Sequence, residues 1–132
     1  MSENMSVLRT LIAASLRKDH DAFLETMTDD IEYVWRIGVR PLRGKVTMRK
    51  FLRNYEAGFE QRDWTITRWA EKDDVVLVEG VESLYDRNRD VLIENPYMQA
   101  IEFQDGKICK VRDYYDSALV SAAERPPADA KA

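Results

Sequence analysis

The chain is poor in the two side chains that most often bind metal ions or act as nucleophiles. Its 132 residues include one cysteine, Cys109, and one histidine, His20. A single cysteine excludes an intramolecular disulfide, and its place in a strand-like pattern favours a small buried apolar residue over a nucleophile. His20 stands in the polar run RKDHD, which indicates a solvated loop. These side chains are too few for the usual zinc ligand sets, although carboxylates can substitute, so we expect no metal site.

The chain also lacks blocks of like charge and long apolar runs. It has 20 Lys and Arg against 24 Asp and Glu, scattered along its length, for a net charge of -4. A protein that binds a phosphate backbone normally carries a basic stripe. No apolar run approaches membrane-spanning length, and the opening MSENMSVLRT does not resemble a signal peptide. We therefore expect neither a nucleic-acid nor a membrane partner, and a cytoplasmic location.

Apolar periodicity predicts three helices in the first half of the chain. Apolar residues recur at helical spacing in residues 5–18 and 21–28. A third helix, capped by Thr47, carries an apolar stripe that includes Phe51 and Tyr55. Such a stripe most often packs in a core, but these two side chains could each show one edge to a cavity.

Alternating apolar residues predict that the rest of the chain is mostly extended. The expected strands are residues 30–36, 63–71, 75–85, 92–103 and 107–115, separated by turns at Asp73-Asp74, Asp86–Asp90 and Asp105-Gly106. We expect one domain over residues 1–124 and a disordered tail over residues 125–132. Because the strands have more apolar surface than three helices can cover, a homodimer is expected; alternatively, residues 117–124 cover the surplus within one chain.

The last predicted strand, KICKVRDYYD, contains a carboxylate among apolar neighbours. Alternation places Asp113 on one face with Cys109, Val111 and Tyr115. A carboxylate held there loses hydration, which raises its pKa and suits it to proton transfer near neutral pH. The alternative is that Asp113 reaches water at the strand end and forms a structural ion pair with a nearby arginine.

Pairing of the strands extends this prediction to a pocket. A two-residue turn at Asp105-Gly106 would pair Met98 with Asp113, so that Met98 and Val111 line a pocket around the acid. Glu82 alternates with apolar residues that include Leu84, which favours the pocket side for both.

Three segments carry a resemblance to a known family. TDDIEYVW, RPLRGKVTMRKFL and KICKVRDYYD, within the expected order of elements, resemble the nuclear transport factor 2-like superfamily and its SnoaL-like and limonene-epoxide-hydrolase-like branch. The resemblance implies an α+β, cystatin-like cone, in which a strongly curved antiparallel sheet and three helices from the N-terminal half enclose a pocket. It covers about residues 5–118.

The same resemblance implies site residues. Asp113 falls on the water-activating aspartate of the hydrolases, Tyr33 on the tyrosine that positions the water, and Glu82 on the proton-donating aspartate. The bridging arginine of those enzymes falls on Gly80, and their asparagine falls on Trp35, so their epoxide-opening mechanism does not transfer directly.

Further positions bear on the chemistry that the resemblance implies. Arg36 or Arg68 could replace the missing arginine from another strand. Gly80 could instead permit a bulge or sharp bend. The general base of ketosteroid isomerases falls near Trp35, which cannot abstract a proton.

Two functions therefore remain in competition. The first is a SnoaL-like, cofactor-free enzyme of isomerase, cyclase or hydrolase type, which acts on an apolar substrate through Asp113 as acid or base, Glu82 as partner acid and Tyr33 as donor to an oxyanion. The second is a non-catalytic small-ligand-binding or dimerisation module of the same fold. In both, the expected ligand contacts are Trp35, Met98, Val111, Leu84, Phe51 and Tyr55.

Overall fold

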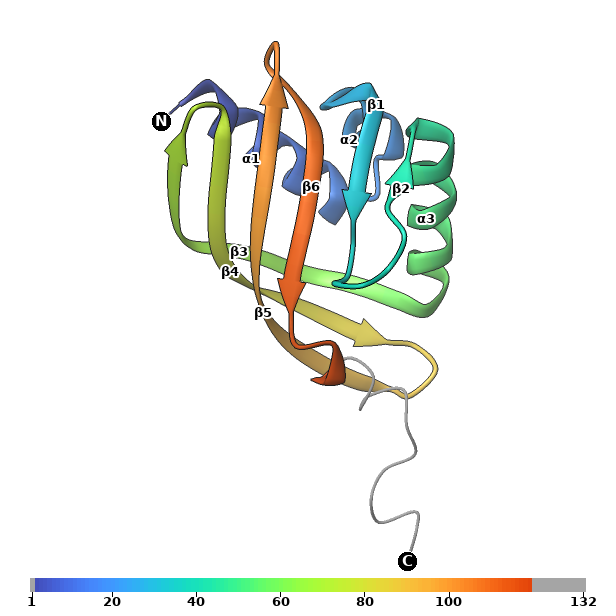
Figure 1. Cartoon of the computed structure of the whole chain (residues 1–132). Coiled ribbons are helices and arrows are strands. Elements are labelled where there is room, and N and C mark those ends of the chain that lie inside the picture. Colours follow the sequence, from blue (N-terminus) through green and yellow to red (C-terminus); the bar gives the residue numbers. More distant parts are fainter. Residues whose placement is uncertain (1, 120–132) are drawn as a thin grey trace, which may run out of the picture.

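One curved six-stranded sheet forms the body of the protein, and three helices lie against it (Figure 1). The computed structural model describes residues 2–119. The helices are α1 (Glu3–Leu16), α2 (His20–Glu25) and α3 (Lys45–Gly58); the strands are β1 (Met27–Val34), β2 (Leu42–Arg43), β3 (Phe59–Lys72), β4 (Val75–Asp86), β5 (Val91–Gln104) and β6 (Lys107–Tyr115). The strand order is β2-β1-β6-β5-β4-β3, and only the β1–β6 pair is parallel. The α+β architecture is the predicted one.

The helices begin at polar or glycine caps, not always where the sequence suggested. Ser2 caps α1 by accepting a hydrogen bond from the backbone N–H of Met5, and Asp19 caps α2. His20 opens α2, and its Nε2 lies 2.9 Å from Oε2 of Glu56 in α3, so the prediction of a solvated loop residue was wrong. The third helix begins directly after Gly44 rather than at a Thr47 cap.

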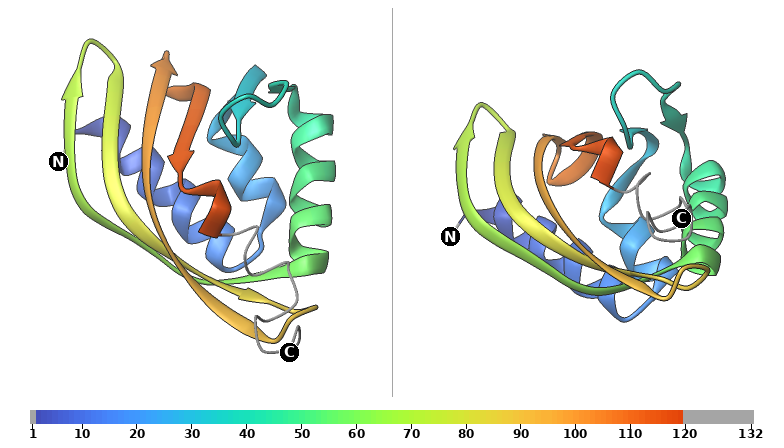
Figure 2. Two further views of the ribbon diagram at one scale, coloured as in Figure 1. Left: turned by 60° about the horizontal axis from the view of Figure 1, so that its bottom comes forward. Right: turned by 90° about the horizontal axis from the view of Figure 1, so that it is seen from below.

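The long strands β3, β4 and β5 bend around the helices (Figure 2). The register of β3 against β4 shifts at two places, one of them between Ile66 and Arg68, opposite Gly80. A Cβ atom on Gly80 would lie 1.9 Å from the backbone oxygen of Thr65, so only glycine permits this close approach of the two strands. The expectation that Gly80 serves a bulge is confirmed.

A second irregularity changes the predicted pairing of β5 with β6. The turn pairs Gln104 with Lys107 as expected, but the register shifts after Phe103, so that Asp113 pairs with Gln99 instead of Met98. Met98 therefore points to the outer face and is 49% exposed, and its predicted place in the pocket was wrong. Val111 does lie on the inner face, but it is buried in the core and does not line the cavity.

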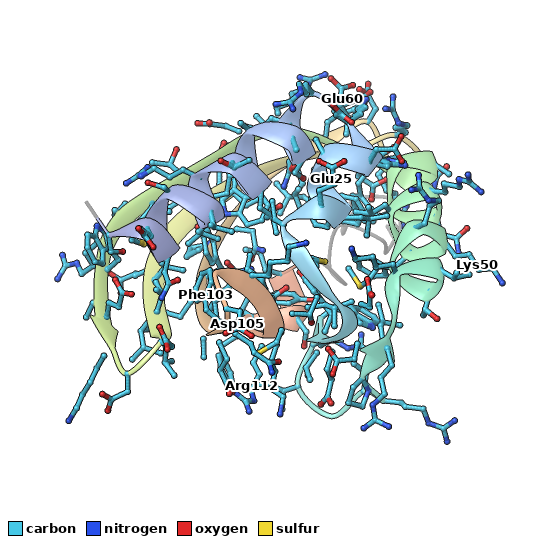
Figure 3. The ribbon with its side chains drawn as sticks, turned by 90° about the horizontal axis from the view of Figure 1, so that it is seen from above. Glu25, Lys50, Glu60, Phe103, Asp105 and Arg112 are labelled. Atoms are coloured by element: carbon cyan, nitrogen blue, oxygen red, sulfur yellow. The ribbon has the colours of Figure 1, made fainter. Side chains whose placement is uncertain are left out.

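The inner face of the sheet packs on the helices, whereas the outer face carries exposed apolar side chains. The described core joins α1 and α2 to inner-face residues such as Ile31, Val78 and Ile101. On the outer face, Arg112 lies away from the helices, as Figure 3 shows, and its Nη1 is 2.8 Å from Oε2 of Glu102. Leu77, Met98 and Tyr114 are each more than 40% exposed.

Among residues 2–119, no helix has both the length and the apolar character needed to cross a bilayer. The predicted boundary at residue 124 and the predicted tail, residues 125–132, lie outside the described residues.

Candidate active site

A cavity of about 230 Å³ lies between the inner face of the sheet and α3. One wall is aromatic: Tyr33, Phe51, Tyr55 and Phe59 form a row in which successive ring centroids are 5.4 to 6.2 Å apart, and Trp35 packs on Phe51 at 5.9 Å. The strands opposite contribute polar side chains: Gln61, Glu82, Asn95, Gln99 and Asp113. The cavity is therefore mostly apolar, and its two carboxyl groups, Asp113 and Glu82, come from the sheet.

Asp113 enters the cavity from β6 with both carboxylate oxygens already bound. The hydroxyl of Tyr33, on the adjacent strand β1, donates to Oδ2 at 2.7 Å, and Nε2 of Gln99, the paired residue on β5, donates to Oδ1. Neither donor carries a charge. Each oxygen keeps lone-pair capacity for another proton, so the carboxylate is oriented but still able to act as a base.

Glu82 enters from β4 and is held in the same way. Its Oε2 accepts a hydrogen bond from Nε2 of Gln61 on β3. The amide of Gln61 is itself fixed, because its Oε1 accepts a hydrogen bond of 2.6 Å from the hydroxyl of Ser15 at the end of α1. Asn95, the residue paired with Glu82 on β5, also hydrogen-bonds to it. The second carboxyl is thus supported by two neutral amides.

Burial shifts the pKa values of both acids toward neutrality. Loss of hydration raises the pKa of Asp113 from 3.8 to about 6, although its hydrogen bonds from Tyr33 and Gln99 act in the opposite direction. Burial likewise raises the pKa of Glu82 from 4.5 to about 7, with a further contribution from the negative charge of Asp113. Near pH 6.5, the state with Asp113 ionised and Glu82 protonated is consequently well populated.

The tyrosines of the site stay protonated. Burial, followed by the nearby charge of Asp113, raises the pKa of Tyr33 well above its ordinary value. Burial also raises the pKa of Tyr55, and the hydroxyl of Tyr55 and Oδ1 of Asn95 are buried without a hydrogen-bond partner among the described residues. Two polar atoms beside the cavity are therefore available to a ligand after small side-chain movements.

No cation stands between the two carboxyls in the described structure. The space beyond Gly80 is taken by Tyr97, whose hydroxyl would be 2.7 Å from a Cβ atom there and which accepts a hydrogen bond of 2.7 Å from Nε1 of Trp64. Arg68 lies on the outer face and pairs with Glu79, and Arg36 stacks on Trp35. Neither arginine replaces the bridging one.

The structure thus brings together most of the site residues that the sequence indicated. Asp113, Glu82 and Tyr33 all line the cavity, and so do Trp35, Leu84, Phe51 and Tyr55; Met98 and Val111 do not. Hydrogen bonding to Asp113 occupies the proton of Tyr33, so this hydroxyl orients the acid and is not free to stabilise an oxyanion.

The supporting amides Gln61, Asn95 and Gln99 were missed by the sequence interpretation. Each is a neutral polar residue within a strand, and such residues give no distinctive signal. Correct pairing would have found Gln99 opposite Asp113 and Asn95 opposite Glu82, but the register shift hid the first of these pairs. No group of three or more His, Cys, Asp or Glu side chains within residues 2–119 is arranged to hold a metal ion.

Comparison with known proteins agrees with this fold and cavity. The sequence model of the SnoaL-like domain matches residues 8–111, and the chain belongs to that family. No curated protein matches the chain significantly in sequence.

Solved structures of similar shape are more distant in sequence. They include an NTF2-like protein of unknown function from Burkholderia pseudomallei (TM-score 0.85, 19% identity, covering 93% of this chain and 98% of that one). An LEH-like epoxide hydrolase of M. tuberculosis has a TM-score of 0.77 and 21% identity over 92% of this chain and 88% of that one. TerC, co-crystallized with polyporic acid, has a TM-score of 0.82 and 20% identity over 94% and 100%. At these identities the likeness concerns the cone-shaped NTF2-like fold.

Proposed function

We propose that the protein is a cofactor-independent acid–base enzyme that moves a proton on an apolar small molecule bound in the cavity. The observation that carries this proposal is the pair of carboxyls, Asp113 and Glu82, held by neutral donors in one apolar cavity with pKa values of about 6 and about 7. General acids and bases work best when their pKa lies near the working pH. No ion pair of Asp113 is present among the described residues, which supports the proposed role over a structural ion pair.

Asp113 is the base in this mechanism. With a ketone as substrate, its carboxylate takes a proton from the carbon beside the carbonyl, and the C–H electron pair becomes the carbon–carbon π bond of an enol. The proton of Glu82 passes to the carbonyl oxygen. Where the ketone carries a β,γ double bond, the enol is a dienol, and return of the Asp113 proton to its γ carbon and of the enol proton to Glu82 completes an isomerisation and restores the Asp113 carboxylate and the Glu82 acid. Tyr33 and Gln99 keep the carboxylate in place throughout.

Tyr55 is the group best suited to help stabilise charge on the substrate oxygen. Its hydroxyl is buried, keeps its proton and has no partner among the described residues, unlike that of Tyr33. An unpaired buried hydroxyl costs roughly 1–3 kcal/mol, and a ligand oxygen would recover this cost. A donor that is already desolvated also needs little reorganisation when charge develops.

Turnover and binding must be measured separately to test the proposal. Small ketones that bind, as judged by quenching of tryptophan fluorescence, should exchange their α-hydrogens with D₂O in the presence of the protein, as followed by NMR. Asp113→Asn should abolish exchange but keep binding, whereas Asp73→Asn, an exposed turn position, should change neither. Binding without Asp113-dependent exchange, and without opening of small epoxides, would contradict the proposal.

A ligand-binding module is the second candidate, and one observation favours it. In the described structure both carboxyls are held by neutral donors, amides and a tyrosine, without the arginine of the hydrolases. The co-crystallisation of the similarly folded TerC with polyporic acid is compatible with either role. In this case Asp113 would only orient the ligand.

We also propose that the outer face of the sheet forms the interface of a homodimer. Leu77, Met98 and Tyr114 are exposed there on three adjacent strands, β4, β5 and β6. Large exposed apolar patches are rare on monomeric proteins and often mark a surface where two proteins associate.

A further inference from the structure

The one Arg or Lys that lines the cavity within residues 2–119 is Arg36. It follows the end of β1, and the next residue, Ile37, is 67% exposed, so Arg36 lies at the rim. Its Cζ atom stands 4.9 Å from the centroid of the Trp35 ring. The aromatic face holds the planar guanidinium in place without neutralising it.

Arg36 is partly buried, yet no carboxylate of residues 2–119 forms an ion pair with it. The neighbouring Arg43, which is more exposed, has Glu32 as its partner. A guanidinium has five N–H donors, and those turned away from solvent need acceptors. Arg36 is thus a half-buried cation beside an apolar cavity. An anionic ligand would supply the negative charge that it lacks.

The charged groups of the cavity come from different elements. Asp113 and Glu82 project from β6 and β4, whereas Arg36 follows β1 at the rim. An anionic group would be repelled by the carboxyls and attracted by Arg36. The orientation of a bound anion is therefore fixed, with its charge outward and its apolar body along the aromatic row.

We infer that the cavity accepts an apolar monocarboxylate, whose carboxylate binds Arg36 while its far end reaches Asp113. The fork of a guanidinium matches a carboxylate with two parallel hydrogen bonds. The volume of about 230 Å³ is roughly one and a half times that of an engineered cavity that holds benzene, which suggests a body of about ten non-hydrogen atoms. A single ring with a short acid chain fits, and a tetracyclic body does not. A reaction at the far end of this ligand depends on the proposed function, whereas its binding by Arg36 does not.

Unreactive probes test the recognition independently of turnover. trans-Cinnamate and cinnamamide have the same shape and differ in charge, and their dissociation constants can be measured by calorimetry at pH 6 and low salt. The wild type should bind the carboxylate about tenfold more tightly, since a charged hydrogen-bonded pair is the stronger one. Arg36→Gln should remove this preference and change the affinity for the amide less than about twofold. Arg40→Gln, an exposed position in the same loop, is the matched control and should keep the preference.

Three outcomes would overturn the inference: equal or tighter binding of the amide by the wild type, a preference that survives Arg36→Gln, or no binding of either probe. These outcomes can be separated from failure of the proposed function. If the protein prefers the carboxylate but shows no Asp113-dependent proton exchange, the proposed enzyme activity is refuted and the binding of carboxylic acids stands. Proton exchange on neutral ketones without carboxylate preference would leave the enzyme and remove only the role of Arg36.

Discussion

Replacing Asp113 by asparagine should stabilise the protein, and the gain should depend on pH. The substitution keeps the shape of the side chain but removes its charge. Oδ1 of the asparagine can accept from Tyr33, and a turned amide at Gln99 can accept from the new Nδ2, so that both present contacts have neutral equivalents. The fold should therefore remain intact.

The magnitude follows from the pKa of Asp113. Burial raises it from 3.8 to about 6, and each pH unit of such a difference corresponds to about 1.36 kcal/mol, so ionisation costs the folded state up to about 3 kcal/mol. This pKa of about 6 already includes the lowering effect of the hydrogen bonds from Tyr33 and Gln99. Because the folded state binds the proton more tightly, this acid favours folding below about pH 4, and its contribution is lost as the pH rises through about 6.

Urea unfolding of the wild type and the variant, followed by fluorescence of the three tryptophans, measures the effect. The free energies of unfolding should be nearly equal at pH 4, and at pH 8 the variant should be more stable by about 1–3 kcal/mol. Asp73→Asn applies the same chemical change at an exposed turn and should show no such trend. Differences taken at one pH cancel the effects of the carboxylates that do not interact with Asp113.

The reasoning would be refuted by a variant that is less stable than the wild type at pH 8. It would also be refuted by a difference that does not change between pH 4 and pH 8. Either result would mean that Asp113 is a well-compensated structural carboxylate, and the case for a poised base would fall with it.

Three other predictions concern activity, the close approach of two strands, and assembly. For a ketone substrate, kcat/KM should follow a bell-shaped pH profile, rising through about 6 as Asp113 ionises and falling above about 7 as Glu82 loses its proton, and Glu82→Gln should remove the falling limb. In thermal unfolding, Gly80→Ala should cost about 1–3 kcal/mol because its Cβ meets the β3 backbone, whereas Gly58→Ala, which meets nothing closer than 4.0 Å, should cost nothing. Sedimentation should show a dimer that Met98→Glu converts to a monomer; a monomeric wild type would contradict this.

The sequence predicted the three helices and the long strands because their apolar periods are regular. It also placed Asp113 on the correct side of β6, together with Val111 and Tyr115. The prediction of the β5–β6 pairing failed because it assumed strict alternation from the turn onward, whereas an extra residue in β6 shifts the register and puts both Ile108 and Val111 in the core. Met98 was consequently assigned to the wrong face of the sheet, and Gln99 was overlooked.

The hydrogen-bond donors of the site are uncharged, which explains why the pKa values of Asp113 and Glu82 both lie near neutral pH. A guanidinium between Asp113 and Glu82 would favour both ionised forms and lower both pKa values, which would leave Glu82 unable to donate a proton near pH 7. Amides orient the carboxyls equally well without adding charge, and burial then raises both pKa values. Because a Cβ atom at Gly80 would clash with the backbone of Thr65 and the hydroxyl of Tyr97, an arginine fits at this position only if β3 and Tyr97 move. A chain with an arginine at this position would need a different bend in its sheet. The close approach of β3 to β4 at Gly80 therefore shapes the sheet and also keeps out a cation that would lower both pKa values.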